Sequence, residues 1–429
     1  MLIEFSVGNY LSFKEKVTFS MVAADLSSQN TITDKNNNNI FAIDSELKLL
    51  KSAAIYGANA SGKSNLANAL NFMRQFVLNS SRETQVTDTI DVDNFRLSTE
   101  TETQPSFFEI VFIIQKKIYR YGFEADINQV FSEWLYHVPK NKEYCLFERK
   151  DNLFKIRKKF REGDRLDTIT RKNALFLSVV AQFNGKIAQV ILSWFSKMNI
   201  ISGVQDSLFR HITHQYMQNI ENKSEVIKFI QELDLSIIDI RLKESSLETE
   251  SIPNVLLEDL RWLFGKVDSQ ITIETIHHKY NNKGEVISRE VFDLDRNESE
   301  GTKKVFAFST PILQTLKYGR VLVMDELEAR LHPLITRAIV ELFNSPETNP
   351  KNAQLVFMTH DASLINGKLF RPDQIWFMEK SQQEYTVLYS LAEYKLKPDA
   401  DLKENYIKGR YGAIPFIGNL KSFISSLDG

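Results

Sequence analysis

The chain of 429 residues is 43% hydrophobic and 25% charged, and its 53 basic and 55 acidic side chains leave a net charge of −2. This composition is typical of a globular protein with two or three units of ~150 residues, and it excludes a disordered chain and a uniformly basic nucleic-acid coat. One cysteine, Cys145, excludes a disulfide framework and a multi-cysteine metal site. Apolar runs stay far below the ~20 residues that span a bilayer, and the first residues do not resemble a signal peptide. We therefore expect a cytoplasmic protein with no membrane partner.

The first 150 residues alternate between strand and helix patterns. Residues 2–20 alternate apolar and polar side chains around a Gly-Asn pair, which predicts two short strands. An apolar strand over 50–56 leads through a glycine-containing turn into a helix over 65–77. Residues 107–124 predict a hairpin that turns at Gln115-Lys116. We assign residues 1–150 to the first half of an α/β domain.

The stretch from 151 to 285 has a different pattern and is predicted to be an inserted subdomain of helices and strands. Apolar residues between 187 and 195 have helical spacing, Ser224 is expected to cap a second helix, and residues 271–292 predict a hairpin. From 286 to 429 the α/β pattern returns, which predicts the second half of the first domain. Its expected strands cover 321–324, 355–358, 375–378 and 386–389, with helices over 305–316 and 333–343.

The strongest motif is the octapeptide from Gly57 to Ser64, which matches the phosphate-binding loop G-x-x-x-x-G-K-[S/T] between a predicted strand and a predicted helix. Glycines allow backbone N–H groups to surround phosphates, and the helix N-terminus adds a positive field. Lys63 is expected to contact the β- and γ-phosphates of ATP, and the Ser64 hydroxyl to ligate Mg²⁺. The residues expected to bind the nucleotide at this loop are Gly57, Asn59, Ser61, Gly62, Lys63, Ser64 and Asn65.

Two further strand ends carry polar residues that fit this chemistry. The strand 321–324 is followed by Asp325, expected to hold Mg²⁺ through water, and by Glu326, expected to polarise the attacking water. A buried strand that ends in acids is common by itself, so the upstream phosphate-binding loop is what favours the functional interpretation. The strand 355–358 ends in Thr359-His360, where the histidine could hydrogen-bond a γ-phosphate. The predicted catalytic residues are Lys63, Glu326 and His360, and the predicted metal ligands are Ser64 and Asp325.

A fourth motif comprises residues 298–302, Glu-Ser-Glu-Gly-Thr, immediately before an apolar helical pattern. A Ser-x-Gly turn that opens a helix is an anion-binding N-terminus, although the same residues also serve as an ordinary helix cap. In its place before the acid pair this motif resembles the signature loop of ABC-type ATPases. Residues 298–302 are called the signature loop below.

The order of phosphate-binding loop, insertion, signature loop, acid pair and terminal histidine resembles the ABC-type ATPase heads of the SMC and RecF kind. More narrowly, the chain resembles prokaryotic AAA-family ATPases of the overcoming-lysogenization-defect-like group, including ATPase subunits of anti-phage systems such as PARIS. The segments that carry the narrower resemblance are Glu4-Phe5, Asn9 to Phe13, Tyr119 to Phe123, Glu133 to Tyr136, Leu331 to Pro333 and Gly409 to Pro415.

The resemblance implies an α/β P-loop NTPase fold of ABC type, with an insertion between its two halves, that uses ATP and Mg²⁺. It also implies that Ser299, Gly301 and Thr302 touch the γ-phosphate bound to a second head. The chain is therefore expected to form a homodimer or a higher even-numbered homo-oligomer. His332 stands where ABC heads carry the aspartate of their dimer-interface loop, and Gln104 is a candidate for their glutamine loop.

The expected function is an ATPase cycle that regulates a separate effector in anti-phage defence, with a Toprim-type nuclease as the expected kind of partner. The alternative is a DNA-binding repair or recombination ATPase, because residues 155–172 hold eight basic and three acidic side chains. The same stretch also fits a solvated hairpin. A self-contained nuclease is disfavoured: Glu379, Asp399 and Asp401 superficially fit its acids, but only 69 residues (361–429) follow His360, too few for a second α/β domain.

Overall fold

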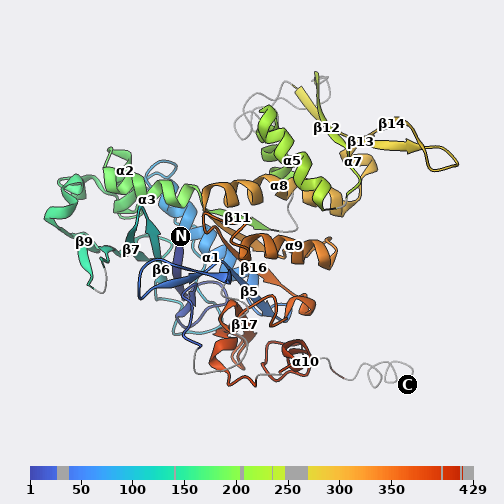
Figure 1. Cartoon of the computed structure of the whole chain (residues 1–429). Coiled ribbons are helices and arrows are strands. Elements are labelled where there is room, and N and C mark those ends of the chain that lie inside the picture. The colour runs from blue at the N-terminus through green and yellow to red at the C-terminus, as the bar shows by residue number, and fades with distance from the viewer. Residues whose placement is uncertain are drawn as a thin grey trace, which may run out of the picture. The chain divides into compact units, whose positions relative to one another are not determined.

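The computed structural model describes residues 1–26, 38–139, 142–202, 207–233, 235–246, 269–397, 400–415 and 418 (Figure 1). It divides into two compact units. The first comprises Met1–Gly203, Thr315–Ala329 and Thr336–Gly429, and the second comprises Val204–Gln314 and Arg330–Ile335.

These units differ from the predicted boundaries near 150 and 285. Residues 151–203 belong to the first unit because their apolar side chains, such as Phe160 and Phe195, share one hydrophobic core with Phe147. Residues 286–314 belong to the second unit, where Leu294 and Phe306 are buried. Part of the predicted insertion, 247–268, lies outside the described residues.

An antiparallel sheet of seven strands forms one layer of the first unit. Its order is β10-β9-β8-β7-β6-β1-β2, and the bounds are β1 (Leu2–Gly8), β2 (Val17–Ser20), β6 (Ser106–Ile114), β7 (Lys117–Ala125), β8 (Val130–His137), β9 (Tyr144–Lys150) and β10 (Leu153–Ile156). Buried and partly buried residues alternate along most of β6, as expected for a strand with one face on a core. The two strands predicted over 2–20 pair with each other as β1 and β2. The hairpin predicted over 107–124 is confirmed, since β6 turns into β7 at Gln115-Lys116, where both residues have positive φ. A small separate ladder joins β3 (Ile40–Ala42) to β4 (Lys48–Leu50).

The second sheet of the first unit has the order β11-β15-β16-β5-β17-β18, in which all pairs are parallel except β17 with β18. The bounds are β5 (Ser52–Gly57), β11 (Asn199–Ser202), β15 (Val321–Asp325), β16 (Gln354–Thr359), β17 (Ile375–Lys380) and β18 (Thr386–Ser390). The central strands β5 and β16 are buried along their whole length, which explains their continuous apolar sequences. Because the pairing is parallel, β5, β16 and β15 end side by side at one edge.

Helix α1 (Lys63–Asn79) packs between these two sheets (Figure 1). Its buried residues Leu66, Leu70, Met73 and Val77 recur every three or four positions, which places them on one face of the helix. The same core includes α2 (Phe176–Gln182) and α3 (Lys186–Ser196). Among the described residues no single helix is long and apolar enough to cross a membrane. Within the ranges that the structure describes, only α2 and α3 taken together, bent by 107°, reach that length and composition.

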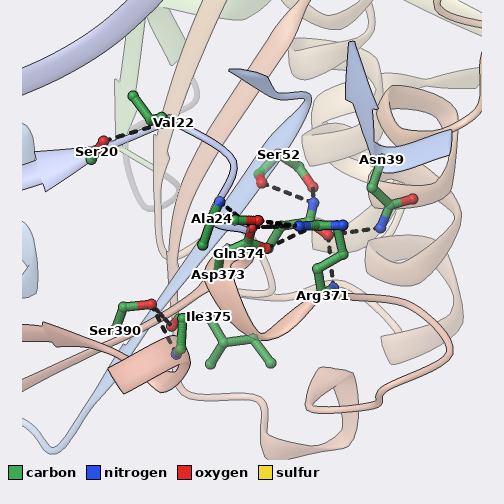
Figure 2. A network of polar contacts seen from close by, with 11 residues as sticks. Ser20, Val22, Ala24, Asn39, Ser52, Arg371, Asp373, Gln374, Ile375 and Ser390 are labelled. Carbon is green, nitrogen blue, oxygen red and sulfur yellow. Dashed lines mark hydrogen bonds and ion pairs between the residues drawn. The ribbon is translucent and has the colours of Figure 1, made fainter. Parts of the chain in front are cut away.

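A buried polar network fastens the beginnings of β5 and β17, at the end of the sheet opposite Gly57 (Figure 2). Gln374 donates to the Ser52 carbonyl at 2.9 Å and accepts from Asn39 at 2.7 Å. Arg371 forms an ion pair with Asp373 at 2.8 Å, with both side chains 5% exposed, and Asp373 accepts the backbone N–H of Ala24. These buried groups have partners, so they hold the strand starts in register.

The second unit contains α4 (Ser207–Met217), α5 (Ile220–Glu232), α7 (Leu294–Asn297) and a sheet of β12 (Asp239–Ser246), β13 (Ser269–Tyr280) and β14 (Val286–Asp293). The predicted hairpin over 271–292 is confirmed by β13 and β14. The prediction that Ser224 caps a helix is wrong. Asn219 caps α5, because its side chain accepts the N–H groups of Glu221 and Asn222, and Ser224 lies inside the helix.

Helix α8 (Glu300–Tyr318) begins in the second unit and ends in the first. It contains Pro311, which has no N–H to donate to the carbonyl of Ala307 one turn earlier. The hydroxyl of Thr213 in α4 donates to that carbonyl at 3.1 Å, so the buried oxygen keeps a partner. Helix α9 (Pro333–Asn344) follows β15 and has proline in its first turn, as predicted.

Candidate nucleotide-binding site

The turn between β5 and α1 has no room for a side chain at two of its glycines. A Cβ on Gly57 would clash with the carbonyl oxygen of Met378 and with Ser61 Oγ. Gly62 precedes α1 with φ 103°, a conformation that favours glycine, and a Cβ there would clash with Thr386 Oγ1. The motif glycines are therefore required by the packing of the turn itself.

Two side chains from distant parts of the sequence, together with Asn65 in the first turn of α1, support this turn. Thr386, buried at the start of β18, donates its hydroxyl to the Ser61 carbonyl at 2.8 Å and lies 2.7 Å from Ser12 Oγ. Asn65 donates from Nδ2 to the same Ser12 hydroxyl at 2.7 Å. The conformation of the loop thus depends on the turn before β2 and on the edge strand β18. Sequence reasoning did not find Ser12 or Thr386 as parts of the site.

Lys63 is held inside the curve of the loop. Its ammonium donates to the carbonyls of Gly57 at 2.8 Å and Ala58 at 3.0 Å. Burial lowers the pKa of Lys63 to about 8, against the opposing effect of Asp325, Glu328 and Glu326. The Lys63 ammonium therefore lies between the loop carbonyls and the nearby acids, where it could contact a phosphate bound in the loop.

Asp325 ends β15 and lies next to the first turn of α1. The Ser64 hydroxyl hydrogen-bonds its carboxylate, which partly offsets the burial that raises the pKa of Asp325. The other oxygen, Oδ1, is buried and has no partner among the described residues. Ser61 Oγ, on the loop, is also buried and unpartnered within the described part of the chain.

These oxygens fit the group that the loop motif implies. Hard divalent cations such as Mg²⁺ prefer carboxylate and hydroxyl oxygens, and Asp325 and Ser64 present one of each at adjacent strand and helix ends. A cation could satisfy Asp325 Oδ1, and nucleotide phosphates could reach the loop residues Asn59 and Ala60, which are exposed. Ser64 and Asp325 could hold the metal, and Lys63 could face the phosphates.

His360 follows β16, between the other two strand ends. Its ring hydrogen-bonds the carbonyl of Gly57, and its backbone N–H donates to Glu328 Oε1 at 2.5 Å. Although the side chain is still exposed, desolvation and then the charge of Lys63 lower the pKa of His360. Glu326 adopts φ 53°, an uncommon backbone conformation for a non-glycine residue, directly after Asp325. The predicted residues Lys63, Asp325, Glu326 and His360 thus meet at one edge of the sheet.

Two acids and a tyrosine beneath this edge were also missed from the sequence. Tyr56 is fully buried, and burial, with the charges of Asp361 and Glu328, raises the pKa of its phenol well above the ordinary range. One oxygen on each of these three side chains is buried without a partner among the residues that the structure describes. Glu328 comes three residues after Asp325, and that acidic spacing was the one available signal.

The signature loop belongs to the second unit. Ser299 Oγ accepts the backbone N–H of Thr302 at 3.1 Å and lies 2.9 Å from the Thr302 hydroxyl, so Ser299 caps α8. Glu300 forms an ion pair with Arg330 at 2.7 Å, and a Cβ on Gly301 would lie 2.9 Å from the Arg330 carbonyl oxygen. Glycine is therefore needed where the segment after β15 approaches the loop.

Other residues that the sequence singled out have structural contacts. Glu379 accepts the N–H of Ala413 at 2.9 Å, and Asp401 caps α10 (Leu402–Ile407), while Asp399 lies outside the described residues. His332 accepts the N–H of Leu334 at 3.2 Å at the start of α9. Gln104 contributes its backbone carbonyl to Asn9, and within the described residues its side chain makes no hydrogen bond to the loop.

A phosphate-binding loop after β5, with an acid pair two strands away and a polar strand end between them, defines an α/β P-loop NTPase of ABC type, as the sequence predicted. Residues 52–366 match the family described as "AAA domain, putative AbiEii toxin, Type IV TA system". The chain belongs to this AAA-domain family.

Solved structures that match the chain include head domains of Smc. The Smc head bound to the C-terminal winged-helix domain of ScpA is 13% identical, with a TM-score of 0.44 over 91% of this chain and 99% of that one. A Smc head with an extended coiled coil and the C-terminal domain of ScpA, from Pyrococcus furiosus, is 12% identical, with a TM-score of 0.39 over 91% and 97%. A Smc head with coiled coil and joint from Pyrococcus yayanosii is 9% identical, with a TM-score of 0.40 over 96% and 99%. No curated protein sequence matches the chain.

Proposed function

We propose that this chain hydrolyses ATP between two copies of itself and uses that cycle to regulate a separate effector protein. The observation that carries the proposal is the meeting of Lys63, Asp325, Glu326 and His360 at three adjacent strand ends, with buried oxygens that lack partners among the described residues. The AAA-domain family supports nucleotide chemistry at this edge. Mg²⁺ bound with ATP supplies charge stabilisation of the phosphates.

Each residue has a role that follows from its position. Ser64 and Asp325 hold the metal, and Lys63 leaves the carbonyls of Gly57 and Ala58 to contact the phosphates. Glu326 orients the attacking water and accepts a proton from it. His360, already bonded to the Gly57 carbonyl, links the state of the loop to the end of β16.

The signature loop completes the site of a second copy. Ser299 and Gly301 lie at the start of a long helix, and the helix dipole favours an anion at this end. This arrangement supports a homodimer that closes around two nucleotides. A separate effector is supported by the structural contacts of Glu379 and Asp401, which occupy two of the acids that a nuclease site in this chain would need. A nuclease in an anti-phage system remains the kind of effector that we propose.

The first test replaces the water-orienting group. Glu326→Gln should bind Mg-ATP like the wild type, hydrolyse it at least ~100-fold more slowly, and accumulate as a nucleotide-bound dimer in size-exclusion chromatography. Lys63→Ala should instead lose nucleotide binding. Wild-type turnover by Glu326→Gln would remove Glu326 from the reaction.

The second test asks whether the site is shared between chains. Purified heterodimers of Gly301→Asp with Lys63→Ala chains contain one intact site, formed by the phosphate-binding loop of the first and the signature loop of the second. They should regain up to half of the wild-type rate, although each variant alone is inactive. Heterodimers that form but stay inactive would contradict a shared site.

A DNA-binding ATPase is the second candidate, because Lys155, Arg157, Lys158, Lys159, Arg161, Arg165 and Lys172 are all exposed. Arg171 is excluded from this surface, since it donates to the carbonyls of Thr84 and Ser80. Fluorescence anisotropy with a double-stranded oligonucleotide would test it. Binding through this surface should weaken in Lys158→Glu/Arg161→Glu/Arg165→Glu, with a salt dependence that is flatter by roughly 0.9 for each phosphate that the variant no longer neutralises.

A further inference from the structure

The residue immediately before Ser299 is held by the sheet of the second unit. Glu298 Oε1 accepts from the hydroxyl of Thr275 and lies 2.7 Å from His277 Nε2, and both of these partners belong to β13. The Glu298 and His277 side chains are only 10% and 17% exposed. Two hydrogen bonds orient this largely buried carboxylate. Loss of either partner would leave a buried acceptor unsatisfied, so the orientation is strongly favoured.

The partners of Glu298 are themselves fixed. Thr275 is fully buried and pairs with Phe292 of β14, and the His277 ring packs on the Phe292 ring with centroids 4.8 Å apart. Thr275 and His277 are two positions apart on one strand, so their side chains point to the same face and converge on one carboxylate.

The contacts of Glu298 extend directly into the signature loop. Ser299 follows it in the chain and is bonded to Thr302 in the first turn of α8. On the preceding side, Leu294 in α7 is 1% exposed, and Asp293 caps that helix. Only residues 295–298 lie between buried Leu294 and Ser299. We therefore expect the orientation of Glu298 to determine where the Ser299 hydroxyl and the following N–H groups point.

We propose that Glu298 is a positioning residue for the signature loop, and that Thr275 and His277 of β13 hold it in the conformation that acts on nucleotide. The β12–β14 sheet thereby controls ATP hydrolysis through a carboxylate that touches neither nucleotide nor metal. This inference rests on the proposed shared site, in which the signature loop of one chain acts on nucleotide bound by another.

The test uses His277→Phe, which keeps the ring against Phe292 and removes the hydrogen bond to Glu298. The affinity of the variant for Mg-ATP at its own phosphate-binding loop should stay within twofold of wild type, while kcat falls about tenfold or more. His277→Gln, whose amide can still donate to Glu298, should recover most of kcat. Thr275→Val, which removes the other donor without a change in shape, should lower kcat in the same way.

Two heterodimers with the same substitutions, distributed differently, separate positioning from general damage. When His277→Phe is paired with Lys63→Ala, the one working site uses an intact signature loop and should match wild type paired with Lys63→Ala. When wild type is paired with Lys63→Ala/His277→Phe, the working site meets the altered loop and should be about tenfold slower. Equal rates in these two arrangements, the reverse order of rates, or no recovery in His277→Gln would overturn the proposal.

A separate pair of heterodimers tests the proposed shared site itself. Wild type paired with Lys63→Ala/Gly301→Asp should be inactive, and Gly301→Asp paired with Lys63→Ala should be active. If these two arrangements behave alike, or if the first is active and the second is inactive, the shared site is wrong. If the first is inactive and the second active, as expected, while the two His277 arrangements have equal rates, only the role of Glu298 is wrong.

Discussion

Thr386 offers a direct test of how the phosphate-binding loop is held. Thr386→Val keeps the shape of the side chain but removes the hydroxyl that donates to the Ser61 carbonyl at 2.8 Å and contacts Ser12 at 2.7 Å. The site is fully buried, so no water replaces the missing donor. An unsatisfied buried acceptor costs about 1–3 kcal/mol, and the relaxed loop would lose the conformation that binds phosphate. At 1.4 kcal/mol for each tenfold change, the Kd for Mg-ATP should rise roughly 5- to 150-fold.

Isothermal titration calorimetry with Mg-ATP measures this effect on the Glu326→Gln background, where hydrolysis does not interfere. Thr386→Ser retains the hydroxyl and should bind within about threefold of the parent. Thr336→Val is the matched control, because Thr336 of α9 is also buried but its hydroxyl has no partner among the described residues. Equal affinities for Thr386→Val and Thr336→Val would refute the view that β18 holds the loop.

Three further predictions concern charge, backbone and stability. The lowered pKa of Lys63, about 8, means that its ammonium is lost as the pH rises, so the association constant for Mg-ATP should be level below pH 7 and fall by up to tenfold per pH unit above pH 8. Lys63→Arg, which stays charged, should flatten that profile in the same titration. Gly62→Ala should abolish nucleotide binding, measured by calorimetry, because φ 103° and the nearby Thr386 hydroxyl leave no place for a Cβ. Asp373→Ala leaves the buried Arg371 guanidinium without its carboxylate and should lower the free energy of unfolding by about 3–5 kcal/mol in urea, while Arg371→Met/Asp373→Ala should lose less than the single variant.

The parts of the site that could be predicted are those whose chemistry is local in sequence. The phosphate-binding loop requires residues without a side chain at Gly57 and Gly62, and the buried strand β15 requires a short apolar run before Asp325. Each requirement produces a sequence pattern that fits within eight residues. The contact between Ser12 and Thr386 joins residues 374 positions apart, and no local pattern records it. In the sequence, Tyr56 cannot be distinguished from the apolar residues of a buried strand, although its phenol lies near Asp361 and Glu328.

The errors have equally physical causes. A serine before an apolar pattern is a good cap, but Asn219 is an equally good one five residues earlier, and the helix begins where its side chain accepts two N–H groups. Periodicity showed that α3 has an apolar face without showing which core that face joins. Periodicity alone therefore places residues 151–203 in the insertion, although in the structure they complete the core around α1.

Helix α8 has a mechanical property that follows from Pro311. Between residues 307 and 311 the helix lacks one backbone hydrogen bond, and the hydroxyl of Thr213 supplies the missing donor from outside. Because the Ala307 carbonyl is bonded to a side chain of a neighbouring helix, α8 can bend here at the cost of that one hydroxyl contact, with no loss of a backbone hydrogen bond within the helix. Helix α8 starts at the signature loop, and two residues separate its end from β15. Through the Thr213 hydroxyl, α4 therefore opposes the bending of a helix that joins these two parts of the chain.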